Sequence, residues 1–196
     1  AVLAVLAYHA ELGPFKGGLV GVDVFFVVSG FLITSLMLRE MSTTGRISLS
    51  DFWARRARRL LPASAMVIVV TLIAARWTLS PVARRSLGHD ALAACGFVIN
   101  IVFGRRNSDY LGAQMSAAAP SALLHYWSLA LEEQFYVIWP LVLFAVSRTR
   151  QRARNLRMTV GVLFVASFVA CLWYTKHSPV WAFYLLPTRA WELLAG

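Results

Sequence analysis

An apolar run over residues 122–146 contains two adjacent carboxylates, Glu132 and Glu133. The run is long enough to cross a bilayer, which needs about 20 predominantly apolar residues. Ionisable groups at such depth are costly unless they are paired or face a polar cavity. In a helix, Ser128, Glu132 and Tyr136 are spaced by four and share one face. The run therefore predicts a membrane-spanning helix with one polar face.

Further long apolar runs follow one another along the chain. The hydrophobic content is 59%, and only 14% of the residues are charged, a combination that soluble domains seldom reach. We therefore predict an all-α fold, a polytopic bundle of transmembrane helices that forms a single partial domain over residues 1–196. The predicted spans are residues 1–10, 19–38, 60–79, 122–146, 158–175 and 180–196.

One apolar segment, residues 91–103, is shorter than the others. Its length is more typical of a re-entrant or interfacial segment than of a full crossing. Arginines gather in a predicted loop and basic stretch at residues 39–59 and again at residues 148–157. Such clusters favour the cytoplasmic side. If both clusters face the cytoplasm, an even number of crossings lies between them, and the short segment does not cross.

The ends of the chain and its net charge bear on its completeness and on its possible partners. Residues 1–10 and 180–196 are expected to be truncated helices, so the chain is interpreted as a fragment. The formal charge of +10 could indicate nucleic-acid binding, but short arginine clusters between apolar runs are explained by topology. We expect a lipid bilayer as partner and no nucleic acid. No metal is predicted, because His89 and His177 lack partners at a ligand spacing.

Two ionisable side chains near the start of the chain are candidates for chemistry. His9 ends an apolar segment, and a neutral imidazole can accept a proton from a hydroxyl; a histidine that merely caps the helix end is an equal alternative. Asp23 lies in the first turns of the next span. Its carboxylate could orient that imidazole, or could simply interact with the positive end of the helix dipole.

Four arginines, Arg55, Arg56, Arg58 and Arg59, directly precede the span at residues 60–79. This cluster is denser than topology requires, since one or two arginines orient a helix. Arg56 and Arg59 are three residues apart on one helical face and could grip a phosphate or pyrophosphate through bidentate hydrogen bonds. On composition alone, anchoring to lipid headgroups is the favoured alternative.

The acidic helix offers further candidates. His125 borders this helix and could join a network centred on Glu132, although a lone interfacial histidine is more often structural. Ser128 and Tyr136 complete that network on the shared face. The side chains at positions 133–134 turn toward other neighbours of the helix.

These residues closely resemble the membrane-embedded acyltransferase-3 family of bacterial and eukaryotic O-acyltransferases. The matching stretches occur in the right order over nearly the whole chain: residues 8–9, 21–33, 52–62, 125–140 and 187–196. The resemblance implies transfer of an acyl group, usually acetyl from acetyl-CoA, to a hydroxyl of a carbohydrate or other extracytoplasmic acceptor. Peptidoglycan, lipopolysaccharide sugars, exopolysaccharide and a secondary metabolite all fit this class. Acyl-CoA is implied as a co-substrate, with no tightly bound cofactor.

The resemblance also assigns roles residue by residue. His9 is similar to the essential first-helix histidine of the family, and on that basis we expect it to act as general base, without a metal. Arg56 and Arg59 are similar to the R-x-x-R pair near the cytoplasmic face. Glu132 is similar to the acid of the W-S-L-x-x-E-x-Q-F-Y motif. The implied location is the bacterial cytoplasmic membrane, as a multi-pass protein.

The matching stretches add three weaker candidates, Ser29, Arg189 and Glu192. The last two are one helical turn apart in the segment 183–196, which is similar to the branch of the family that often bears a C-terminal SGNH-type domain.

A transporter or flippase is the alternative from another class, with Glu132, Glu133 and Arg189 as a proton or substrate pathway. It gives no reason for the pair Arg56 and Arg59. A purely structural membrane scaffold is a third alternative. Binding of acetyl-CoA that disappears when both arginines are replaced distinguishes the enzyme from the transporter.

Overall fold

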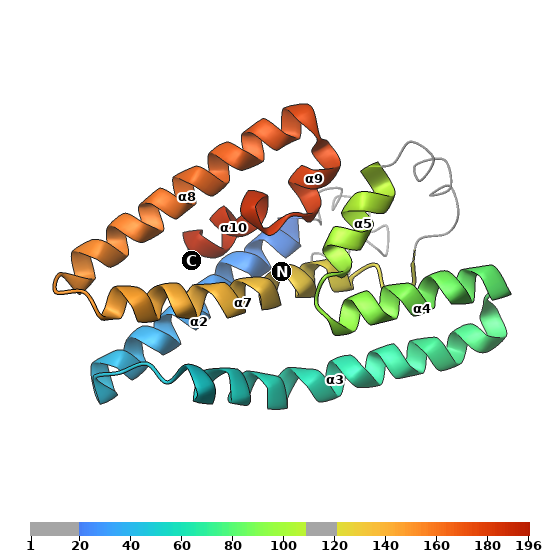
Figure 1. Ribbon diagram of the computed structural model, residues 1–196, viewed down its shortest axis with the longest axis horizontal. Helices are drawn as coiled ribbons and strands as arrows, with labels where there is room; N and C mark the ends of the chain where they lie inside the picture. Colours follow the sequence, from blue (N-terminus) through green and yellow to red (C-terminus); the bar gives the residue numbers. More distant parts are fainter. Residues whose placement is uncertain (1–19, 109–120) are drawn as a thin grey trace. The chain divides into compact units, whose positions relative to one another are not determined.

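The computed structural model describes residues 20–108 and 121–196, and every regular element in these ranges is a helix (Figure 1). The all-α prediction is therefore confirmed. The helices are α2 (Val20–Thr44), α3 (Leu49–Thr78), α4 (Pro81–Cys95), α5 (Ile99–Ser108), α7 (Tyr126–Ser147), α8 (Arg152–His177), α9 (Pro179–Tyr184) and α10 (Leu186–Ala195).

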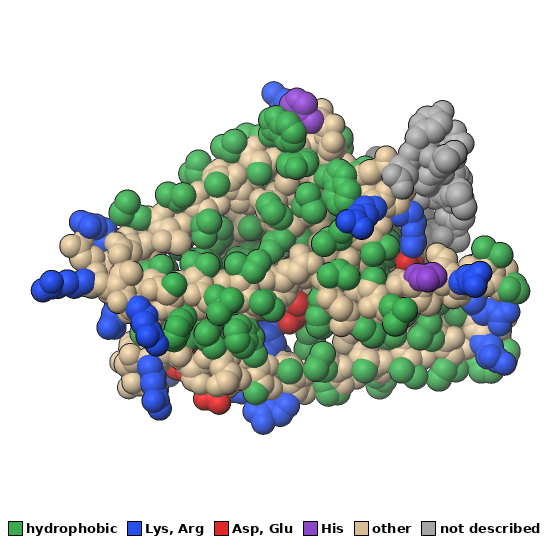
Figure 2. All heavy atoms as spheres, viewed as in Figure 1, with side chains coloured by type: hydrophobic (Ala, Val, Ile, Leu, Met, Phe, Trp, Pro, Cys, Tyr) green, Lys and Arg blue, Asp and Glu red, His purple; other side chains and the backbone are tan. Residues whose placement is uncertain are grey.

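Within these ranges, α2, α3, α7 and α8 are long and apolar enough to cross a membrane. Figure 2 shows hydrophobic side chains along α8 and basic side chains at both of its ends, the pattern expected of a helix whose ends meet water on the two sides of a bilayer. The chain is therefore a multi-pass membrane protein. The exposed apolar side chains of α8 include Val162, Val165, Val169, Leu172 and Trp173.

The basic stretch between the first two spans is mostly helical, which corrects the predicted loop at residues 39–59. α2 continues to Thr44, and Gly45 then adopts a φ of 73°, a left-handed conformation that costs glycine no Cβ clash. Ser48 caps α3, because its hydroxyl accepts from the backbone N–H of Asp51 at 3.4 Å. The four arginines thus lie on the second and third turns of α3.

Two predicted segments are each divided into two short helices. The segment 91–103 is interrupted between α4 and α5, where Phe97 adopts a φ of 51°. The predicted span at 180–196 is instead α9 followed by α10, with a break at Leu185. Pro187 favours this break, since in one continuous helix its ring would clash with the carbonyl four residues earlier and its missing N–H would leave that carbonyl without a partner. None of these four short helices is among the candidate spans.

The chain divides into two compact units, and α7 contributes residues to both. In the described part of the first unit (residues 20–47, 135–182 and 186–196), α10 packs against both α2 and α8, and Figure 1 shows α10 beside α8. The contact with α2 is unusually close. A Cβ added to Gly30 would overlap the backbone carbonyl of Leu193, so this crossing requires glycine.

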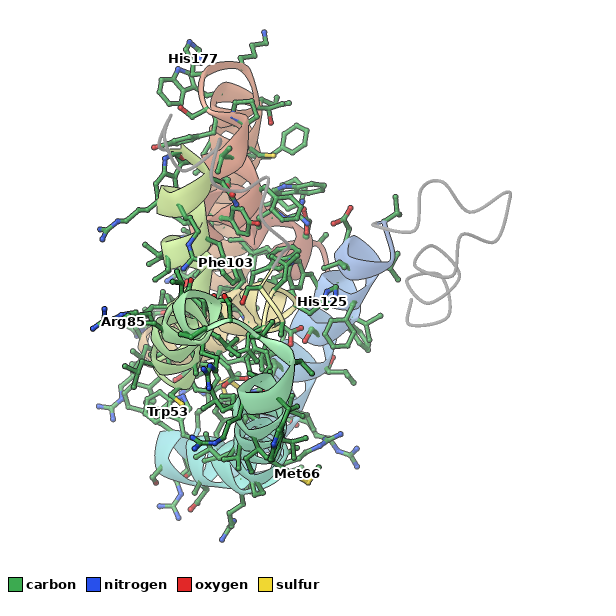
Figure 3. All side chains as sticks on the ribbon, turned by 90° about the vertical axis from the view of Figure 1, so that its right-hand side faces the viewer. Trp53, Met66, Arg85, Phe103, His125 and His177 are labelled. Carbon is green, nitrogen blue, oxygen red and sulfur yellow. The ribbon has the colours of Figure 1, made fainter. Side chains whose placement is uncertain are left out.

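The described part of the second unit contains α3, α4, α5, the first turns of α7 and residues 183–185. α4 packs against α3 and α5. In Figure 3, Met66 points outward from α3 and Arg85 points outward from α4. The outer face of α3 is therefore available to lipid, while the inner side of this unit carries the polar contacts described next.

Candidate active site

The start of α3 is joined to α7 by an ion pair between Arg56 and Glu133. The Nε and Nη2 atoms of Arg56 both donate to Oε1 of Glu133, at 2.8 and 2.6 Å. Only 24% of the arginine side chain and 13% of the glutamate side chain are exposed. Arg55, Arg58 and Arg59 are exposed. Arg56 therefore faces the acidic helix and is less exposed than the other three arginines of the basic cluster.

A second contact joins the same two helices. The hydroxyl of Tyr126 donates to the carbonyl oxygen of Ser64 at 2.9 Å and accepts from the Ser64 hydroxyl at 3.5 Å. Ser64 follows Arg56 by eight residues, whereas Tyr126 precedes Glu133 by seven. The first half of α3 and the first turns of α7 are therefore antiparallel, with contacts two turns apart.

Gln134 connects α7 to the turn between α4 and α5. Its side-chain nitrogen donates to the Phe97 carbonyl at 2.8 Å and to Oδ1 of Asn100 at 2.9 Å. The buried Asn100 in turn donates to the carbonyl of Tyr184 at 2.9 Å. Glu133 contacts α3, and Gln134 contacts the turn between α4 and α5. This confirms the expectation that these two side chains turn away from the face that Ser128, Glu132 and Tyr136 share.

The same unit contains an ion pair that the sequence analysis missed. Asp90 is buried in α4, and its two carboxylate oxygens accept from Nη2 and Nη1 of Arg106 at 2.6 and 3.3 Å. The Arg106 guanidinium also lies 5.5 Å from the ring centre of Phe103. The signal in the sequence was a carboxylate directly before the apolar segment 91–103, which predicts a partner without identifying it.

Glu132, the central acid of the predicted polar face, is buried, with 4% of its surface exposed. The hydroxyl of Tyr136, one turn further along α7, is hydrogen-bonded to the hydroxyl of Ser29 on α2. Ser128 donates to the backbone carbonyl of His125 at 3.3 Å, within the turn that starts α7. The structure thus brings Ser29 and Tyr136 together, and His125 lies exposed at the helix start.

Arg189 lies between two carboxylates in the first unit. Its Nη2 donates to Oδ1 of Asp23 at 2.6 Å, and its Nη1 lies 3.0 Å from Oε1 of Glu192. The exposed fractions are 14% for Arg189, 39% for Asp23 and 1% for Glu192. The guanidinium is also 5.7 Å from the ring centre of Phe26. The single positive charge of Arg189 thus compensates one of the two negative charges beside it. Its contact with Asp23 connects α10 to the first turn of α2.

Position 9 lies outside the described residues, so the predicted pairing of His9 with Asp23 stays a prediction. Among the described residues, no group of three or more His, Cys, Asp or Glu side chains could hold a metal ion. The arrangement offers arginines at the start of one span and carboxylates inside others. These groups suit an anionic ligand at the membrane surface and polar or proton-transfer chemistry at depth.

Comparison with known proteins identifies the family. The acyltransferase-3 model, described as an acyltransferase domain, matches residues 1–196. The peptidoglycan O-acetyltransferase OatA of Listeria monocytogenes is 38% identical over 198 residues, which cover 100% of this chain and 31% of the relative. The O-acetyltransferase OatA of Staphylococcus aureus is 40% identical over 172 residues, which cover 87% of this chain and 27% of the relative.

The chain spans less than a third of the length of these curated relatives. No solved structure matches it. The family model nevertheless extends over every residue of the chain. The chain therefore belongs to the acyltransferase-3 family.

Proposed function

We propose that this chain is the membrane region of an O-acetyltransferase that transfers an acetyl group from acetyl-CoA to a hydroxyl of peptidoglycan in the bacterial cytoplasmic membrane. The observation that carries the proposal is the match over the full chain to a relative named as a peptidoglycan O-acetyltransferase. A multi-pass protein suits this reaction, because acetyl-CoA is cytoplasmic whereas peptidoglycan lies outside the membrane.

The donor would bind at the basic start of α3. Acetyl-CoA carries a pyrophosphate and a further phosphate, and guanidinium groups bind phosphates through paired hydrogen bonds. In the proposed arrangement Arg56 and Arg59 bind these phosphates. The exposed position of Arg59 and the partly exposed position of Arg56 support this role, since a donor that arrives from water must be able to reach both.

In the proposed reaction, His9 accepts the proton of the acceptor hydroxyl, and the hydroxyl oxygen attacks the thioester carbonyl carbon. Collapse of the tetrahedral intermediate breaks the carbon–sulfur bond. The CoA thiolate then takes the proton from the imidazolium, which leaves an O-acetyl ester and free CoA. Asp23 orients the imidazole, and the buried Glu132 anchors polar groups inside the membrane. The partial exposure of Asp23 beside Arg189 supports the first of these two roles.

Muropeptide mass spectrometry tests the proposal. Cells that express the full-length protein should contain O-acetylated muropeptides, which are heavier because an acetyl group replaces a hydroxyl hydrogen, and cells that lack the gene should not. His9→Ala should lower O-acetylation about 10² to 10⁴-fold, the usual contribution of a general base. His177→Ala, at the exposed end of α8, is the matched control and should leave acetylation unchanged.

A transporter predicts a different result. In that case the purified full-length protein does not bind acetyl-CoA, whether or not Arg56 and Arg59 are present. Binding of radiolabelled acetyl-CoA by the unmodified protein, lost in the Arg56→Ala/Arg59→Ala variant, supports the transferase. Unaltered muropeptides after gene deletion would contradict the peptidoglycan acceptor.

A further inference from the structure

The ion pair between Arg56 and Glu133 singles out one arginine of the basic cluster. Arg55, Arg58 and Arg59 are exposed, whereas Arg56 is directed at α7. The contact uses two of the five N–H donors that a guanidinium carries, one on Nε and one on Nη2. Both donate to the same oxygen of Glu133, so the plane of the guanidinium is fixed relative to α7.

This contact differs from an ordinary surface ion pair. Fully exposed pairs contribute little, because water and salt screen them and both side chains lose freedom. Here 24% of the Arg56 side chain and 13% of the Glu133 side chain are exposed, so the screening is weaker and the arginine is held in one orientation. A phosphate that binds a guanidinium already held in place loses less affinity to the ordering of a long, flexible side chain.

The pairing of α3 with α7 has a second support. Tyr126 and Ser64 hold the same two helices together two turns away from the ion pair. The helices therefore have a contact that is independent of Glu133. Its neighbour Glu132 is buried, with 4% exposure, whereas Glu133 pairs with the basic cluster through Arg56.

We propose that Glu133 is a positioning residue for the acyl donor, which holds the guanidinium of Arg56 in the orientation that binds a phosphate of acetyl-CoA. This inference rests on the proposed function, in which Arg56 belongs to the donor site. Glu133 acts through Arg56 and needs no contact with the donor or with the reacting atoms. Glu133 therefore determines the affinity for the donor and does not change the rate of the acetyl-transfer step.

Glu133→Gln tests this role in the full-length protein in proteoliposomes, with acetyl-CoA as the varied substrate. An amide keeps the size of the side chain and removes the charge that fixes Arg56. We expect KM for acetyl-CoA to rise about three- to tenfold, as expected for loss of one charge-assisted contact, with kcat changed less than about twofold. Equilibrium binding of radiolabelled acetyl-CoA should weaken by the same factor.

Tyr126→Phe is the matched control, because it removes the hydrogen bonds between Tyr126 and Ser64 and leaves Arg56 and Glu133 in place. It should lower the unfolding temperature and leave KM for acetyl-CoA at the wild-type value. An equal rise of KM in Tyr126→Phe would overturn the inference, since helix packing alone would then explain the result. A wild-type KM in Glu133→Gln would overturn it as well.

The charge swap Arg56→Glu/Glu133→Arg separates structure from donor binding, and it keeps an ion pair if Glu133→Gln does not fold. We expect the swap to restore the unfolding temperature without restoring the affinity for acetyl-CoA, because the cation has moved from α3 to α7. Recovery of both would show a purely structural pair and overturn the inference. If the wild-type protein neither binds acetyl-CoA nor transfers acetyl, the proposed function itself is refuted. If the wild type is active and Glu133→Gln behaves like the wild type, only the role of Glu133 is refuted.

Discussion

Arg189 of α10 donates to Asp23 of α2 across 2.6 Å, so an ion pair joins two residues that are 166 positions apart. The same guanidinium faces Glu192, which is almost completely buried. Glu192 is shielded from water and depends on this cation, because a buried carboxylate without a partner is strongly destabilising, whereas Asp23 is 39% exposed. This cluster therefore fixes α10 against the first turn of α2.

Arg189→Gln should be strongly destabilising. The substitution leaves Asp23 and Glu192 without the cation between them, and removal of one partner from a buried pair costs about 3 kcal/mol. Titration of the full-length protein with sodium dodecyl sulfate in mixed micelles measures this loss. Arg150→Gln, an exposed arginine between α7 and α8, is the control and should unfold like the wild type. Equal stability of the two variants would contradict a structural role for the cluster.

Gly30→Ala should separate α10 from α2. The new Cβ would overlap the backbone carbonyl of Leu193. A backbone carbonyl cannot move out of the way, whereas the end of a flexible side chain could. Overpacking of this kind costs about 1–3 kcal/mol. Gly161→Ala on α8 is the matched control, because a Cβ there meets nothing within 4 Å. That control should be neutral or stabilised by up to about 1 kcal/mol through helix propensity.

The spans could be predicted from sequence because hydropathy is a local property. Residues 60–79 and 122–146 both lie largely within helices of the structure, α3 and α7. The helix ends could not be predicted in the same way, because a helix can continue through a charged segment, where hydropathy does not detect it. Arginine and alanine are good helix formers, so α3 begins at Leu49, far ahead of its apolar part. The capping hydroxyl of Ser48 was the available signal.

The sequence allowed us to predict which residues have unusual positions, but mostly not which residues pair with each other. A carboxylate in an apolar run predicts a partner, which is why Asp23 and Glu132 could be singled out. The identity of the partner depends on how distant helices pack. Glu133 pairs with an arginine 77 positions away, and no periodicity links two such residues. The pairing of Arg189 with Glu192 could be predicted, since residues three apart in a helix lie on the same face.

The ion pair between Asp90 and Arg106 should be energetically coupled. Asp90 is buried and accepts from two nitrogens of Arg106, whose side chain is about one-third exposed. Exposure reduces the coupling below that of a fully buried pair, so we expect about 1–2 kcal/mol from a double-mutant cycle with Asp90→Asn and Arg106→Gln. Strict additivity of the two single variants would show that α4 and α5 do not depend on this contact.

Arg59 and Arg56 should respond differently to substitution, although both belong to the proposed donor site. Arg59 is exposed on α3, so Arg59→Ala should weaken acetyl-CoA binding about three- to tenfold without lowering the unfolding temperature. Arg56→Ala also removes the partner of the partly buried Glu133, so it should weaken binding and destabilise the protein by about 1–3 kcal/mol. Radioligand binding and thermal unfolding of the full-length protein measure both effects. Equal destabilisation by the two substitutions would contradict the different environments of these arginines.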